Sequence, residues 1–189
     1  MADPVSALRR RLLTTFRDSP TDTHPHFRSV ERAFLTGASA ALLNPPSTLQ
    51  SAFAMSAFLE PYAWEGAGMA LAMLGALGED GALGPALAAT DEIQGTLMCV
   101  GVGIGLARAR SDTVPDCVLA FAAGVGLVAD GAGFHAGRFE TWRLLARGRV
   151  PPRHPTDAFD RGLGRSLFFV YHSGPGALAA CIDGFGADR

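Results

Sequence analysis

Apolar residues recur at helical spacing along most of this chain, and no useful stretch alternates with the two-residue period of a half-buried strand. Asn44-Pro45-Pro46 ends one such pattern, since proline lacks an amide proton and disfavours α geometry before it. The predicted helices run from about Val5 to Phe16, Phe27 to Leu43, Ser47 or Thr48 to Leu59, Pro61 to Leu77, Thr90 or Asp91 to Arg110, Pro115 to Gly148 and Thr156 to His172, with short ones within 78–89 and after Gly176. We therefore predict an all-α fold: one glycine-rich bundle of about seven or eight helices, with residues 1–26 as an N-terminal helix and linker and 27–189 as the core.

The predicted helices contain many glycines, each of which costs roughly 1 kcal/mol relative to alanine in a helix interior. Small residues spaced four apart would let two helix backbones approach closely. Such pairs are Gly66 with Ala70, Gly101 with Gly105, and Gly133 with Gly137. The alternative is that the missing side chains leave room for a ligand, but we favour close packing.

The charged residues exclude several partners and chemistries. The formal net charge is -2 and the charges are scattered, whereas a nucleic-acid binder concentrates positive charge on one face. Apart from histidine, every basic residue is arginine, which excludes Schiff-base chemistry and a lysine-containing P-loop. The glycines of Gly101–Gly105 and Gly131–Gly137 resemble parts of a dinucleotide motif but lie within predicted helices. We expect no cofactor and no nucleic-acid partner.

The cysteines and the apolar stretches bear on the compartment. Cys99, Cys117 and Cys181 are far apart in apolar surroundings, which indicates buried reduced thiols rather than a disulfide framework. The N-terminus lacks the apolar run and cleavage site of a secretory signal. The longest charge-free apolar stretches fall short of the roughly 18 to 20 residues that cross a bilayer. We expect a soluble, cytoplasmic protein with no membrane partner.

Polar residues set within apolar, glycine-rich sequence are the candidate site. They are Glu65 beside Trp64; Asp130, His135 and Arg138; and Asp160, Arg161 and Arg165. On a helix, Asp130, Phe134, Arg138 and Trp142 share one face. Buried ions need partners, so one interpretation is a set of structural ion pairs, such as Glu65 with Arg138 or Arg165. The other is a polar cluster at the base of an apolar cavity, where a carboxylate or histidine moves a proton and an arginine holds an anion.

Metal binding has little support in the sequence. His24 and His26 lie two positions apart across a proline, and His135, His154 and His172 lack close partners at ligand spacing. We therefore predict no metal site.

Three segments together resemble the DUF1702 family: Trp64-Glu-Gly-Ala-Gly-Met-Ala, Asp130-Gly-Ala-Gly-Phe-His-Ala-Gly-Arg-Phe and Phe159-Asp-Arg-Gly-Leu-Gly-Arg-Ser-Leu-Phe-Phe. Gly101-Val-Gly-Ile-Gly-Leu-Ala lies between the first two, and the resemblance covers roughly Leu8 to Phe185. It implies a setting in bacterial specialised metabolism, since the family includes the Unb-type proteins of enediyne polyketide clusters. Family members commonly continue into a second portion of similar size, so the resemblance also implies a homodimer or a second protein that supplies that portion.

These observations lead to a functional hypothesis: the chain binds a bulky hydrophobic biosynthetic intermediate. If it is an enzyme, we expect cofactor-independent acid–base chemistry such as cyclisation, isomerisation or hydrolysis. Glu65, Asp130 and His135 are the proton-transfer candidates. The candidate substrate-binding residues are Trp64, Phe134, Arg138, Trp142 and Arg165, with the two arginines holding an anionic group. The alternatives are a non-catalytic scaffold or carrier for a biosynthetic complex, and an unusual isoprenoid or polyene cyclase.

Overall fold

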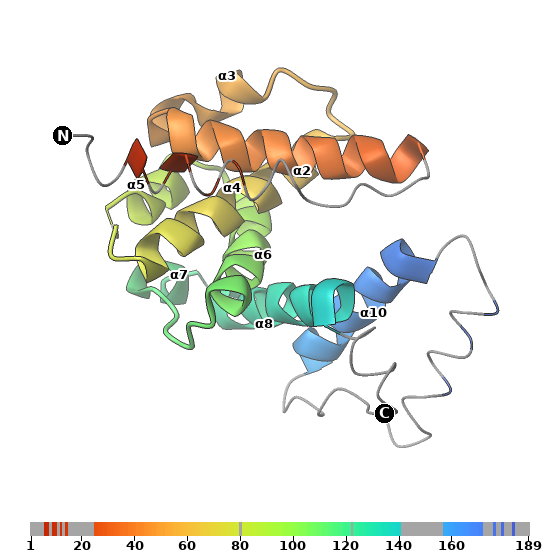
Figure 1. Ribbon diagram of the computed structural model, residues 1–189. Coiled ribbons are helices and arrows are strands. Elements are labelled where there is room, and N and C mark those ends of the chain that lie inside the picture. The colour runs from red at the N-terminus through yellow and green to blue at the C-terminus, as the bar shows by residue number, and fades with distance from the viewer. Residues whose placement is uncertain are drawn as a thin grey trace.

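The fold consists of helices, and the described part of the chain contains no strand, which confirms the all-α prediction (Figure 1). The computed structural model describes residues 25–79, 81–121, 123–140 and 157–171, together with residues 6, 7, 9, 10, 12, 14, 176, 179 and 183. Five longer helices carry the architecture: α2 (Pro25–Leu43), α4 (Glu60–Ala76), α6 (Glu92–Ala109), α8 (Gly124–His135) and α10 (Asp157–Tyr171). Shorter elements connect them: η1 (Pro46–Thr48), α3 (Leu49–Phe53), α5 (Leu83–Ala88), α7 (Asp116–Leu119) and the π-helical turn η2 (Ala136–Glu140).

Local sequence signals account for several helix ends. Asp91 caps α6 through a capping box, in which its carboxylate accepts from the Gln94 amide (2.8 Å) and its own amide donates to the Gln94 side chain (3.2 Å). Pro61 lies in the first turn of α4, where its missing amide proton costs nothing. The predicted boundaries of these two helices are therefore correct to within two residues.

Two predicted helices are broken. The helix expected through Leu59 ends at Phe53, because Ala54 adopts a left-handed conformation (φ 42°). The helix expected from Pro115 to Gly148 begins as α7, stops, and restarts as α8 at Gly124. A side chain at Gly124 would overlap the carbonyl of Val118, so the chain folds back tightly on α7 at this point. Residues 141–148, and the helix expected over residues 5–16 apart from a few isolated positions, lie outside the described residues.

Consecutive long helices cross one another at a repeated glycine pair, Gly-x-Gly. The pairs are Gly66 and Gly68 in α4, Gly101 and Gly103 in α6, Gly131 and Gly133 in α8, and Gly162 and Gly164 in α10. The first glycine of each pair faces the preceding long helix. A Cβ there would overlap the carbonyl of Phe34, Glu65, Val100 or Asp130, respectively. The last three of these residues immediately precede the glycine pair of their own helix.

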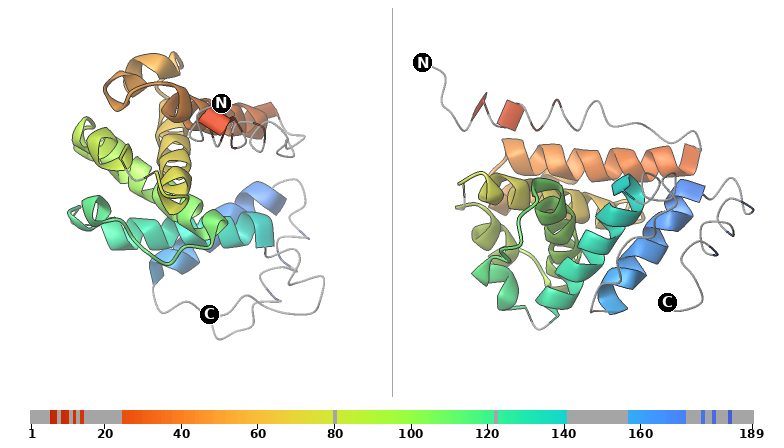
Figure 2. Two further views of the ribbon diagram at one scale, coloured as in Figure 1. Left: turned by 60° about the vertical axis from the view of Figure 1, so that its left-hand side comes forward. Right: turned by 60° about the horizontal axis from the view of Figure 1, so that its bottom comes forward.

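The second glycine of the pairs in α4, α6 and α8 faces the following long helix, again at a constant position. A Cβ at Gly68, Gly103 or Gly133 would overlap the carbonyl of Met98, Val128 or Phe159, each three residues before the next pair. In α2, Gly37 has the same position, because a Cβ there would overlap the carbonyl of Ala63, three residues before the pair of α4. The small residues thus serve close helix packing, and all four crossings share one register. Each long helix therefore packs against the long helix before it, and Figure 2 shows α8 and α10 side by side as the last such pair.

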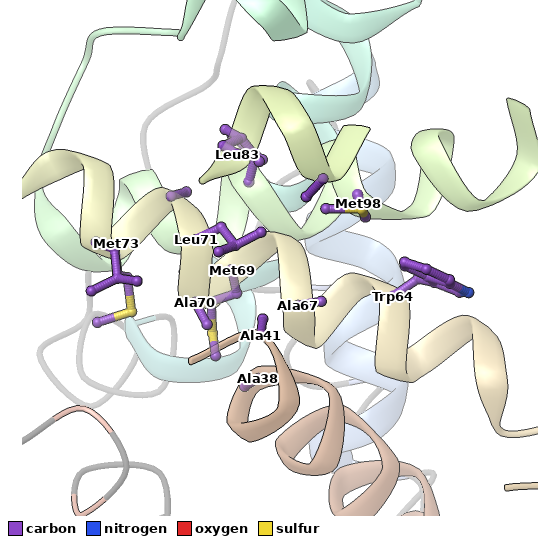
Figure 3. Packing of buried hydrophobic residues seen from close by; sticks show 14 of the residues in the cluster. Ala38, Ala41, Trp64, Ala67, Met69, Ala70, Leu71, Met73, Leu83 and Met98 are labelled. Atoms are coloured by element: carbon purple, nitrogen blue, oxygen red, sulfur yellow. The ribbon is translucent and has the colours of Figure 1, made fainter. Parts of the chain in front are cut away.

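Apolar residues on both sides of these crossings form the core. Figure 3 shows Ala38 and Ala41 of α2 facing Ala67 and Ala70 of α4, where alanines permit the close approach, with Met98 of α6 on the opposite side of α4. All five residues are buried. In the described ranges, no helix combines the length and the apolarity that a membrane crossing requires.

Candidate functional site

Side chains from the five long helices and from η2 line a partly open cavity of about 100 Å³. Its wall is mainly apolar and aromatic: Phe27, Val30, Phe34, Tyr62, Met69, Ile104, Phe134, Phe139 and Phe169. Its charged members are Glu31, Glu65, Arg108, Arg138 and Arg165. An apolar wall with a few convergent polar groups is the usual character of a small-molecule site.

The constant register of the crossings explains why these residues meet. Met69, Ile104, Phe134 and Arg165 each follow the glycine pair of their helix directly, and all four line the cavity. Side chains one helical turn further on, Arg108, Arg138 and Phe169, line it as well. The α10 helix closes the cavity against α2 through an edge-to-face contact between Phe169 and Phe27, with ring centroids 4.9 Å apart.

An ion-pair triad joins three helices at the cavity wall. The two terminal nitrogens of Arg165 on α10 bind Glu65 Oε1 on α4 (3.1 Å) and Asp130 Oδ1 on α8 (2.6 Å). Its guanidinium also lies over the Phe134 ring, 4.9 Å from the centroid. Of the two partners that the sequence interpretation offered Glu65, Arg138 and Arg165, the structure shows Arg165, and the pair lies at the wall of an apolar cavity.

The triad shifts the protonation equilibria of its members. Burial raises the pKa of Glu65, an effect that Arg165 opposes and the nearby Asp130 carboxylate reinforces. Burial disfavours the charged form of Arg165, but the two carboxylates more than offset it and raise the pKa of that guanidinium. The Arg165 side chain retains 34% exposure, whereas that of Glu65 retains only 8%. Glu65 is therefore the buried acid of the site.

The π-helical turn supplies Arg138 and Phe139 to the cavity. A π-turn inserts one extra residue per turn, which changes the faces that the following side chains occupy. Here two successive residues of η2 both line the cavity. Phe134, on the preceding α8, contacts Phe169 edge-to-face at 5.8 Å. Trp142, predicted on the same face, lies outside the described residues.

Two other predicted site residues lie elsewhere. His135 is buried on α8 but does not line the cavity; its ring lies 5.1 Å from that of Phe139. Burial and the positive charge of Arg108 lower its pKa to about 4. Trp64 is a core residue that packs edge-to-face on Phe53 (4.7 Å), and its indole nitrogen donates to Glu60 at 3.2 Å. The structure thus brings together Glu65, Asp130, Phe134, Arg138 and Arg165.

The most consequential residue that sequence reasoning missed is Arg108. It lies in the last turn of the glycine-rich, apolar helix α6, where it resembles an ordinary basic residue of a helix C-terminus. Its guanidinium lies 5.4 Å from the centroid of the Phe139 ring, and burial lowers its pKa. The signal that would have found it is the recurring Gly-x-Gly pair, because Arg108 follows Gly101 of α6 at the same distance in sequence as Arg138 follows Gly131 of α8.

Metal ligands and reactive thiols do not gather at the cavity. In the part of the chain that the structure describes, no three His, Cys, Asp or Glu side chains lie together as a metal site. Burial raises the pKa of the Cys99 thiol to about 11, and the neighbouring Cys117 adds to the effect. Cys99 lies in the core and Cys117 is half-buried, both as free thiols.

Comparison with known proteins identifies the family. The sequence profile described as "Protein of unknown function (DUF1702)" matches residues 6–189, nearly the whole chain. The chain belongs to the DUF1702 family. No curated protein and no solved structure matches it. The motifs that suggested the family lie on α4, α6, α8 with η2, and α10, and each contains the glycine pair of its helix crossing. In this DUF1702 protein, the segments that resemble the family therefore also contain the glycines of the helix crossings and the cavity residues that follow them.

Proposed function

We propose that this chain binds a hydrophobic small molecule in the cavity between its five long helices and serves bacterial specialised metabolism as a biosynthetic protein. The observation that carries the proposal is the convergence of apolar and aromatic side chains from five helices on one space, with a charged triad at its wall. A space of about 100 Å³ is somewhat smaller than the roughly 150 Å³ engineered cavity that holds benzene. A bulky intermediate would insert one ring or branch here and leave the rest outside the cavity.

The test is to identify small molecules that copurify with the protein from a host that makes the metabolites. A Val30→Phe variant places a ring inside the cavity, whereas Val125→Phe adds the same ring at an exposed position as a control. We expect an apolar compound with the wild type and Val125→Phe, and its loss from Val30→Phe, after circular dichroism shows that all three are folded. A wild type without any such compound, but with a stoichiometric protein partner, would favour the scaffold alternative.

A catalytic role has one specific observation in its favour. Glu65 is a buried carboxyl at the wall of an apolar cavity, and burial raises its pKa, which is the direction of shift found in carboxyls that act as general acids. We propose Glu65 as the proton-transfer residue of a cofactor-independent cyclisation or isomerisation. Glu65→Gln should retain the compound but leave it unconverted. Conversion at the wild-type rate by a folded Glu65→Gln protein would refute the catalytic role and leave the binding role intact.

A further inference from the structure

The cavity wall contains three arginines, Arg108, Arg138 and Arg165, and they differ in whether a carboxylate binds them. Arg165 is already bound to two carboxylates, Glu65 and Asp130. Arg108 and Arg138 also line the cavity, and within the described ranges neither forms an ion pair or a hydrogen bond with a carboxylate. Glu31, the remaining acid of the wall, has an interaction of its own. Two guanidinium groups therefore face the cavity without a carboxylate partner in this part of the chain.

The surroundings of Arg108 favour an anion. Its guanidinium lies over the Phe139 ring, which supplies weak cation–π attraction but accepts no conventional hydrogen bond from the guanidinium. The histidine close by is neutral, since burial and Arg108 itself lower the pKa of His135 to about 4. Burial also lowers the pKa of Arg108, which indicates that its charge lacks the compensation that Arg165 receives. An anion placed beside Arg108 would be bound more strongly than at an exposed arginine, because water screens less there.

We propose that the ligand of this cavity carries a carboxylate, held by Arg108 of α6 and Arg138 of η2, while its apolar part lies among the phenylalanine rings. The inference rests on the proposed binding function and names the chemical class of the ligand. It also distinguishes the arginines, because Arg165 is already bound to two carboxylates whereas Arg108 and Arg138 bind the ligand. A planar carboxylate suits this arrangement because guanidinium groups bind it with paired, charge-assisted hydrogen bonds.

The experiment compares benzoate with benzamide, which share a ring of suitable size and differ in charge. Protein-observed NMR titrations give the dissociation constant of each probe for the wild type, Arg108→Gln, Arg138→Gln and the control Arg32→Gln, an exposed arginine of α2 outside the cavity. We expect benzoate to bind the wild type about tenfold more tightly than benzamide, and either cavity variant to remove about that factor, in line with hydrogen bonds to charged groups. Benzamide binding and the Arg32→Gln protein should remain unchanged.

The outcomes separate the two proposals. If neither probe shifts the resonances of the cavity residues, the binding function itself fails. If both probes bind equally to the wild type, the cavity binds apolar molecules and the carboxylate inference is wrong. That comparison needs no variant, so it decides the question even if Arg108→Gln does not fold. Tighter benzoate binding that persists in both cavity variants would also overturn the assignment to Arg108 and Arg138.

Discussion

The glycine pairs make opposite predictions for two chemically identical substitutions, Gly103→Ala and Gly164→Ala. A Cβ at Gly103 would lie 2.8 Å from the carbonyl carbon of Val128 and 2.9 Å from its Cα, against 3.4–4 Å for ordinary contact. All of the overlapped atoms belong to the backbone, so no side-chain rotation relieves the overlap and α6 must separate from α8. A Cβ at Gly164 meets no described atom within 4 Å, and that residue is exposed.

The magnitudes follow from helix propensity and overpacking. Alanine in place of glycine stabilises a helix interior by about 1 kcal/mol, and this is the whole effect at Gly164. At Gly103 the same gain is outweighed by an overpacking cost of about 3 kcal/mol or more, near the upper end of its usual range, because the overlap is with backbone. At about 2–4 °C per kcal/mol for a chain of this size, Gly164→Ala should raise Tm by about 2–4 °C. A net cost of about 2 kcal/mol should lower Tm for Gly103→Ala by about 4–8 °C.

Differential scanning calorimetry of the two variants beside the wild type is the assay. Gly126→Ala, another exposed glycine of α8 with no described atom within 4 Å, is the matched second control and should behave as Gly164→Ala does. Equal melting temperatures for Gly103→Ala and Gly164→Ala would refute the close crossing of α6 and α8. A loss of stability in Gly164→Ala would show that another chain segment packs against that face of α10.

The triad and the buried histidine make three further predictions. Arg165→Gln leaves Glu65 and Asp130 without their cation. Because the Arg165 side chain is one-third exposed, we expect the free energy of unfolding in urea at pH 7 to fall by about 2 kcal/mol, less than the 3–5 kcal/mol of a fully buried pair. An unchanged unfolding midpoint would contradict this. Because the pKa of Glu65 is raised, the folded protein retains a proton that the unfolded chain loses. The stability of the wild type should therefore fall relative to that of Glu65→Gln as pH rises from about 4.5. If the stabilities of the two proteins change with pH in the same way, the pKa of Glu65 is not raised. The lowered pKa of His135 gives the opposite pH dependence, so stability should be lost as pH falls from 6.5 to about 4. His135→Gln should remove this dependence. An NMR titration of His135 with a midpoint near 6.5 would disprove the effect of burial on its pKa.

The helices could be predicted from the sequence more fully than the cavity. The segments over 27–43, 61–77 and 156–172 are long and regularly apolar, so periodicity alone places them close to their observed bounds. The break between α7 and α8 escapes prediction because no proline marks it and apolar residues continue across it. The helix end at Ala54 escapes prediction because a left-handed alanine has no sequence signature.

The cavity could not be predicted residue by residue, because its wall depends on how far each helix slides along its neighbour. Glu65, Asp130 and Arg165 are recognisable individually as polar residues in apolar sequence, but their joint contact spans three helices. The register is nevertheless present in the sequence as Gly-x-Gly pairs beginning at Gly66, Gly101, Gly131 and Gly162. The spacing of small residues within one helix does not reveal this register. It appears only when the four helices are aligned with one another on their glycine pairs.

Aligning the helices on their glycine pairs also separates the residues that the helix crossings need from those that the cavity needs. Glu65, Val100 and Asp130 occupy the same position before their glycine pairs, and each presents its carbonyl to the first glycine of the next helix. Because the crossing uses only backbone at this position, valine serves in α6 where α4 and α8 have carboxylates. The packing of the helices therefore explains neither Glu65 nor Asp130. Burying carboxylates is costly, and an apolar replacement of a buried ion network is often neutral or stabilising. The charges of the triad are thus better explained by the cavity that they border than by the fold that positions them.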